Sequence, residues 1–199
     1  MGNLSNAIVT AFDNVSWDVS DTGEMRDQSM GALSQAIYDY VTDDSFRVVL
    51  ATATGTLVGP PVVPYSGPIA VTITYNSAES LKTQLLSTLV SDNVANLFVA
   101  LAAWLTAPII VTEATEWIPS DIGTVAGVGI TTFPAMVTQG LLANVALKAA
   151  MPDTPQGSWD TLEPFILIGL LGTIAIPLVS GLVGTAAFTG VGTGSVTYS

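Results

Sequence analysis

From Pro164 to Ser199 the chain carries no charged side chain. The region just before it, residues 122–163, holds only Lys148, Asp153, Asp160 and Glu163. A soluble monomer normally spreads charges over its whole surface, because water must solvate that surface. We therefore expect a large C-terminal surface to face something other than bulk water, either other protein subunits or lipid.

The acidic residues gather at the opposite end of the chain. Half of the 16 Asp and Glu lie in residues 1–44, at Asp13, Asp18, Asp21, Glu24, Asp27, Asp39, Asp43 and Asp44. Only 4 Lys and Arg balance them, and the formal net charge is −12. Binding of nucleic acid needs clustered basic residues, so this composition disfavours it.

The chain of 199 residues contains neither His nor Cys. Disulfide scaffolds, zinc fingers, thiol enzymes and His-based catalytic triads each require a side chain that is missing here. Function must therefore be inferred mainly from the surfaces that the chain exposes.

The lipid alternative rests on Phe165–Phe188, 24 residues without a charge, which is long enough to cross a bilayer as a helix. Glycine and Pro177 interrupt this run, and no basic residue follows Lys148 to flank a membrane segment. The N-terminus also lacks the pattern of a secretory signal. Burial between subunits is the favoured interpretation, and a small integral membrane or pore-forming protein with two or three spans is the alternative.

The N-terminal part has helical periodicity. Apolar residues recur at helical spacing over residues 4–12, and a second amphipathic pattern predicts a helix from Asp21 to Thr42. Strand periodicity follows in Arg47–Val58 and in Pro68–Tyr75. Between them, Gly59–Gly67 contains three prolines and is expected to be an extended loop outside the sheet.

Two helices are expected next, one starting near a cap at Asn76 and one from residue 92 or 93 to Leu105 that is apolar nearly all round. Residues 109–112 fit either a strand or the tail of a broken helix, and residues 123–130 are too rich in glycine to be assigned. A helix is expected over Ala135–Ala150 and a loop over Met151–Ser158. The segment Thr189–Ser199 suits an edge strand, and its composition suggests that it shares a sheet with Ala51–Val58.

The predicted fold class is α+β. It comprises N-terminal amphipathic helices, a small Thr/Val-rich sheet with a Pro-rich extended loop, central apolar helices and a hydrophobic C-terminal region. We divide the chain into an acidic helical region, residues 1–44, and a mixed assembly region, residues 45–199, with its hydrophobic segment at residues 164–199.

Candidate catalytic groups are few. Glu113 and Glu116 beside Trp117 are the most suggestive carboxylate pair, but no second catalytic element accompanies them. Asp18, Asp21 and Glu24 lack the loop pattern of a calcium site, and a helix cap explains them more simply. We expect no catalytic residues, no metal site and no cofactor, and no enzymatic activity.

The opening Asn3–Val41 (NLSNAIVTAFDNV, then an amphipathic helix) and the Cys-free, Gly/Thr/Val/Ala-rich remainder resemble minor virion structural proteins of tailed bacteriophages, of the baseplate or tail-tip class. The resemblance implies a subunit buried against its neighbours in a symmetric ring or trimer of the virion. Its partners would be copies of itself and neighbouring structural proteins, with contact to a membrane left open.

Apolar residues of the central helix and of the C-terminal segment are the candidate interface contacts. They are Leu97, Phe98, Leu101, Trp104, Leu105, Phe165, Ile166, Leu167, Leu170, Leu171, Ile174, Ile176, Leu178 and Val179. Gly59–Gly67 is a candidate arm that reaches a neighbour. A third class, a carbohydrate-binding module, would place Trp17, Trp117 and Trp159 on one exposed face.

Overall fold

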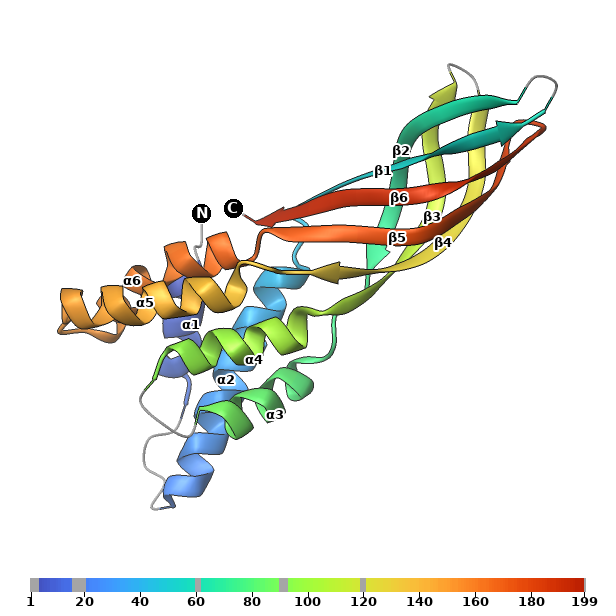
Figure 1. Ribbon diagram of the computed structural model, residues 1–199. Coiled ribbons are helices and arrows are strands. Elements are labelled where there is room, and N and C mark those ends of the chain that lie inside the picture. Colours follow the sequence, from blue (N-terminus) through green and yellow to red (C-terminus); the bar gives the residue numbers. More distant parts are fainter. Residues whose placement is uncertain (1–3, 16–20, 60–61, 90–92, 119–120, 199) are drawn as a thin grey trace.

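The computed structural model describes residues 4–15, 21–59, 62–89, 93–118 and 121–198. In these residues two helices are followed by two strands, and this order occurs three times in succession (Figure 1). The elements are α1 (Leu4–Asp13), α2 (Thr22–Thr42), β1 (Arg47–Val58), β2 (Val63–Ile73), α3 (Ala78–Thr88), α4 (Ala95–Leu105), β3 (Ala107–Ile118), β4 (Asp121–Thr132), α5 (Met136–Ala150), α6 (Pro155–Gly169), β5 (Gly172–Val183) and β6 (Ala186–Tyr198).

The six strands form one closed antiparallel barrel. Each strand pairs with its neighbour in the chain, and β6 pairs with β1 along its length, from Arg47↔Tyr198 to Val58↔Ala187. Closure leaves no strand at an edge. The barrel projects from the helices as an elongated arm (Figure 1).

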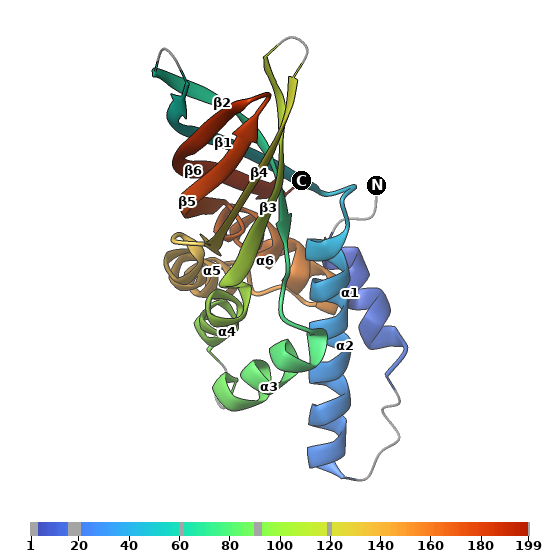
Figure 2. The same cartoon turned by 90° about the vertical axis from the view of Figure 1, so that its right-hand side faces the viewer.

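The helices also close on themselves. Each helix packs against the next along the chain, and α1 packs against α6. The result is a ring of six helices stacked on the six-stranded barrel, with one helix pair and one hairpin contributed by each of three successive segments. Figure 2 shows α1 and α2 on one side of the molecule and α5 and β5 on the other.

A Thr followed by an aromatic residue marks the end of each hairpin, at Thr74-Tyr75, Thr132-Phe133 and Thr197-Tyr198. All three aromatic side chains are buried. They occupy corresponding positions in the three repeats, where the barrel meets the helix ring. Corresponding positions of a structural repeat are expected to pack in the same way.

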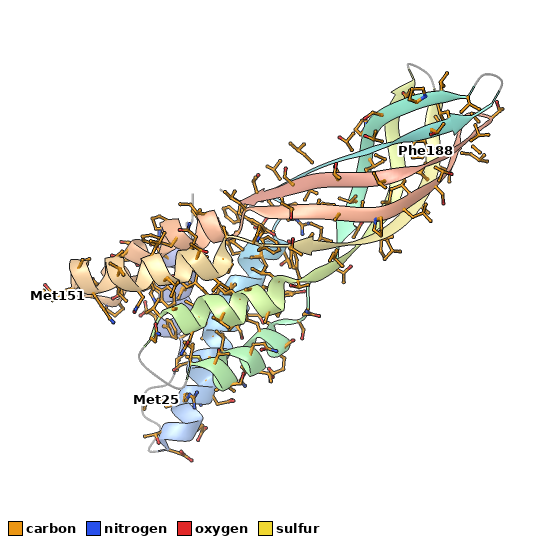
Figure 3. All side chains as sticks on the ribbon, viewed as in Figure 1. Met25, Met151 and Phe188 are labelled. Atoms are coloured by element: carbon orange, nitrogen blue, oxygen red, sulfur yellow. The ribbon has the colours of Figure 1, made fainter. Side chains whose placement is uncertain are left out.

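Small and aliphatic side chains fill the barrel. The inward-facing positions alternate with outward-facing ones, as strand geometry requires, and include Ala53, Ile176, Val179 and Phe188. Phe188 lies on β6 in the part of the barrel far from the helices (Figure 3). At Gly55 and Gly190, which pair across β1 and β6, an added Cβ would collide with the backbone of the facing strand. Glycine at both positions therefore allows the two backbones to approach.

Local signals in the sequence explain the helix ends. Asp21 caps α2 by accepting a hydrogen bond from the backbone nitrogen of Gly23 (2.7 Å), and the predicted helix from Asp21 to Thr42 is confirmed. At α3 the cap is Ser77, not Asn76. The Asn76 side chain instead donates to the carbonyl of Trp104 (3.2 Å) and so ties α3 to α4.

The predicted fold class is wrong in its central feature. The small sheet with a separate hydrophobic C-terminal region is a single closed barrel, because residues 107–118, 121–132, 172–183 and 186–198 are strands as well. The prediction that Thr189–Ser199 shares a sheet with Ala51–Val58 is confirmed, but β6 is paired on both sides and is not an edge strand.

The expected extended loop over Gly59–Gly67 is also wrong, because β2 begins at Val63. Pro64 and Pro68 lie opposite Thr56 and Thr52 of β1, and both face outward. A proline costs a sheet no hydrogen bond where its nitrogen points away from the partner strand. The expected arm toward a neighbour is thus part of the barrel wall.

The uncharged run Phe165–Phe188 is not one helix. It contains the end of α6, all of β5 and the start of β6. Across the portion of the chain that the structure describes, every helix is too short or too polar to traverse a membrane.

Candidate functional site

Most of the interface candidates lie in the core of the chain itself. Trp104, Phe98, Leu101 and Leu105 are buried where α4 faces the other helices and the barrel. Leu97, Ile166, Leu170, Ile174, Ile176 and Val179 are buried too, and Phe165 and Leu167 are partly buried against the core. Leu171 and Leu178 are exposed. The single chain therefore already covers most of the apolar side chains that we assigned to an interface.

Helix α5 presents a different apolar surface, which we call the α5 ridge: Val137, Leu141, Leu142 and Val145. All four side chains are about half exposed or more, with 67 % of Val145 accessible to solvent. The three at Val137, Leu141 and Val145 are four residues apart and so lie on one face of the helix. A surface helix normally carries polar residues on the face that points away from the core. Lys148 continues the same face at the end of α5.

The outer wall of the barrel, where the structure describes its side chains, is largely apolar or rich in threonine. Among the strand residues whose side chains the structure describes, only Arg47 carries a charge. On β3, β4 and β5 the wall exposes Ile110, Val128, Ile130, Leu178 and Leu182, and Ile110 lies directly opposite Val128. On β1 and β6 it is rich in threonine, with Thr52 opposite Thr193 and Thr56 opposite Thr189. Val48 and Leu50 of β1 are exposed as well, so exposed apolar side chains are spread around the described part of the wall.

A groove of about 620 Å³ runs between α1 and α2. Four alanines, Ala7, Ala11, Ala32 and Ala36, form its apolar lining together with Tyr40 and Phe46, whose rings stack 4.8 Å apart. The polar residues that line it are Asn6, Thr10, Asn14, Gln35, Asp39 and Asp43. We call this the α1–α2 groove. Small side chains on both helices leave room there for the larger side chains of an occupant.

The carboxylates of the α1–α2 groove lack a cation. Asp39 accepts a hydrogen bond from Gln35 (2.7 Å), and Asp43 accepts one from the backbone nitrogen of Ser45 (2.7 Å). The hydrogen bonds from Ser45 lower the pKa of Asp43, so it is ionised at neutral pH. Within the described residues neither carboxylate has a basic partner, and none occupies the last turn of α2.

Three of the four basic residues form ion pairs or hydrogen bonds elsewhere in the chain. Lys82 pairs with Asp27 (2.7 Å), Arg47 pairs with Asp44, and Arg26 donates to the carbonyl of Leu86 (2.8 Å). Lys148 differs, because no acidic group of the described residues lies within ion-pair distance of it. In the described part of the chain Lys148, on the α5 ridge side, therefore has no ion pair, and Asp39 and Asp43 of the α1–α2 groove are among the carboxylates without one.

A second cavity, of about 540 Å³, lies between α1 and the start of α6. Trp159 lines it beside Phe12, and the two rings lie 6.2 Å apart in a stacked arrangement. Trp17 and the side chain of Trp117 fall outside the described residues. The predicted common face of the three tryptophans therefore has only Trp159 placed.

The side chains of Glu113, Glu116 and Asp121 also fall outside the description, although their backbones belong to β3 and β4. Asp18 falls outside it too, while Asp21 is the α2 cap. No three acidic side chains in the described residues come close enough together to hold a metal ion.

The reasoning from sequence missed both the α5 ridge and the α1–α2 groove. A signal for the ridge was present in the spacing Val137, Leu141 and Val145 followed by Lys148, beside a second stripe at Met136, Gly140 and Ala143 that faces the core. Packing against its own chain buries one apolar face of such a helix, and the second apolar face is left exposed for another contact.

We searched protein-family models, curated proteins and solved structures, and none of these comparisons found a match to this chain.

Proposed function

We propose that this chain is a non-enzymatic structural subunit that associates with copies of itself through its apolar side. The observation that carries the proposal is the α5 ridge, a row of exposed apolar side chains on one face of a surface helix. Exposed apolar patches of this extent on soluble chains mark interaction surfaces. The virion of a tailed phage, at the baseplate or tail tip, is the setting that we propose from the sequence resemblance.

The available apolar surface suits a stable contact. About a dozen large side chains of α4, α5, the end of α6 and strands β3 to β5 are roughly half exposed, and burying the exposed half of each contributes about 1 kcal/mol. They are Val99, Ile110, Val128, Ile130, Val137, Leu141, Leu142, Val145, Ile168, Leu171, Leu178 and Leu182. The sum, about 10 kcal/mol, is of the same order as the cost of associating two proteins.

Charge selects the side by which copies approach. At −12 per chain, two copies repel each other through the acidic α1–α2 side, and this repulsion is strongest at low salt. The α5 side carries little charge, so contact there avoids most of the repulsion. Each contact in the assembly therefore includes the α5 side of at least one copy.

Sedimentation velocity of the purified chain at micromolar concentration tests the proposal. We expect an oligomer for the natural sequence and a monomer for Leu141→Gln/Val145→Gln, because that variant makes the centre of the α5 ridge polar. The matched control is Val48→Gln/Leu50→Gln, since these β1 side chains are similarly exposed and lie outside the proposed surface. A well-dispersed monomer of the natural sequence would overturn the proposed function.

A further inference from the structure

We infer that the α5 ridge of one copy seats in the α1–α2 groove of the next copy, so that the subunits join head to tail. This inference rests on the proposed function, because it names the partner surface for the self-association. Its basis is the match of the two surfaces in length, in side-chain size and in charge.

The two surfaces have the same length. On α5 the ridge and its terminal lysine extend from Val137 to Lys148, and on α2 the groove lining extends from Ala32 to Asp43. Each span is eleven steps of helix, or about 16 Å. A helix laid along a groove of equal length places all of its anchoring side chains in contact, as in other helix-in-groove complexes.

The side-chain sizes are complementary. The ridge offers branched apolar side chains at Leu141 and Val145, and the groove presents methyl groups at Ala7, Ala11, Ala32 and Ala36. Large side chains on one helix packing over small ones on the facing helices allow close approach. The groove volume of about 620 Å³ leaves room for several such side chains.

The charges are complementary when the two helices run in the same direction. With Val137 near Ala32, the ammonium group of Lys148 comes to the end of the groove that carries Asp39 and Asp43. Those two carboxylates sit at the C-terminal end of α2, where the helix dipole favours a positive charge and α2 itself supplies none. Lys148 of the next copy would supply it.

The position of the two surfaces fixes the type of assembly. In the order of the helix ring, α6 separates α5 from α1, and α3 and α4 separate it from α2, and Figure 2 shows α5 and the α1–α2 pair on opposite sides of the molecule. A contact between two different surfaces of the same chain is heterologous, so it builds a closed ring or an open filament. An isologous dimer, ridge against ridge, is excluded by this pairing.

Mixing two defective variants tests the head-to-tail contact. The ridge variant, Leu141→Gln/Val145→Gln, keeps an intact groove. The groove variant, Ala7→Phe/Asp39→Lys, keeps an intact ridge, and both of its substitutions are at exposed positions. We expect each variant alone to sediment as a monomer and an equimolar mixture to form a species of twice the monomer mass that grows no further.

A charge swap tests the role of Lys148. Lys148→Glu should weaken association by about fivefold in Kd at low salt, which is the size expected of one exposed ion pair, and Lys148→Glu combined with Asp39→Lys should restore it. Glu24→Gln, which removes a charge from α2 outside the groove, should leave Kd unchanged.

The outcomes separate this inference from the proposed function. If the groove variant assembles like the natural chain while the ridge variant does not, the head-to-tail contact is wrong and self-association stands. The same conclusion follows if the mixture stays monomeric, or if the groove engages only an added cationic helical peptide of another sequence. If the natural chain itself is monomeric, both proposals fail.

Discussion

The phenol oxygens of Tyr75 and Tyr198 lie 2.5 Å apart, and one hydroxyl donates to the other in the layer between the barrel and the helix ring. The Tyr75 ring stacks on Trp104 with centroids 6.0 Å apart, and the ring centroids of Tyr198 and Tyr40 lie 6.3 Å apart. The third equivalent position is occupied by Phe133, which has no hydroxyl. The hydroxyls of Tyr75 and Tyr198 thus form a hydrogen bond with each other, and the remaining repeat has Phe133 where a tyrosine hydroxyl would need another partner.

Removing one of the two hydroxyls should lower the free energy of unfolding by more than half as much as removing both. Tyr198→Phe leaves the buried Tyr75 hydroxyl without this partner, and we expect a loss of about 1 to 2 kcal/mol in the free energy of unfolding. The double variant Tyr75→Phe/Tyr198→Phe should be less destabilised than the sum of the single variants. Urea denaturation of all four proteins closes the cycle, and strictly additive losses would show that the hydroxyls are not coupled.

Stability should fall at alkaline pH because of the same pair. Burial raises the pKa of Tyr75 and of Tyr198 above the ordinary value near 10, and the neighbouring Tyr75 raises that of Tyr198 further. Above pH 10 the unfolded chain therefore loses phenol protons that the folded chain keeps, so the free energy of unfolding decreases as pH rises. Below pH 10 this contribution is constant.

Urea denaturation between pH 9 and pH 11.5 measures this effect. The double Phe variant should lose less stability over that range than the natural chain does. An equal fall in both proteins would assign the alkaline loss to other groups.

Two glycines in helices should respond to alanine with opposite signs. At Gly140 of α5 a Cβ would lie 2.5 Å from the Cβ of Phe98, so Gly140→Ala should destabilise the chain by about 2 kcal/mol through overpacking of α4 against α5. At Gly31 of α2 the nearest atoms are side-chain carbons of Lys82, 3.9 Å away. Gly31→Ala should therefore stabilise the chain by up to about 1 kcal/mol through helix propensity. Thermal unfolding of both variants compares the signs directly.

Local patterns in the sequence predicted the elements that alternate clearly. The helix ending at Thr42, the strand Arg47–Val58 and the helix ending at Leu105 lie where periodicity and caps placed them. The strand in Ile109–Thr112, which was one of two alternatives, lacks a polar face, and the strand in Gly123–Ile130, which was not assigned, is rich in glycine. Glycine lowers strand propensity, but inside a narrow barrel it permits two backbones to approach, a benefit that exists only in the tertiary structure.

Whether an apolar side chain is buried in its own chain or between chains could not be read from the sequence. Phe98 and Leu141 are both large and apolar on helices, yet Phe98 is fully buried and 60 % of Leu141 is exposed. The difference arises from ring and barrel closure, which bring α4 inside and leave one face of α5 outside. The residues that low charge density assigned to an interface mostly lie in the core.

Met151 ends α5 in a strained conformation. Its φ is 42°, in the left-handed region that favours glycine, and 77 % of its side chain is exposed. Met151 lies at the end of α5 farthest from the barrel (Figure 3), so few contacts are lost by replacing it. Met151→Gly should raise the free energy of unfolding by about 0.5 to 1 kcal/mol. Met151→Ala keeps the Cβ and should gain nothing, and equal gains in both variants would locate the effect in the lost side chain instead.

Glu163 of α6 closes the helix ring on α1. Its Oε1 accepts hydrogen bonds from the backbone nitrogens of Leu4 (2.7 Å) and Ser5 (3.4 Å), and so places a negative charge at the N-terminus of α1. Ser5 Oγ in turn donates to Asp160 (2.7 Å), and this hydrogen bond, together with one from Gln156, lowers the pKa of the Asp160 carboxyl. Polar contacts therefore contribute much of what holds the ten-residue helix α1 to α6, and Leu4 and Ile8 are its buried apolar side chains.

Removing that anchor should loosen α1 alone. We expect Glu163→Ala to cost about 1 kcal/mol, and Glu163→Gln to cost less because its amide oxygen still accepts the hydrogen bonds. Amide hydrogen exchange should accelerate in α1 and stay unchanged in α3 and α4, since local opening involves only the weakest cooperative unit. If the α1 amides of Glu163→Ala exchange as slowly as in the natural chain, then Leu4 and Ile8 hold α1 without the carboxylate.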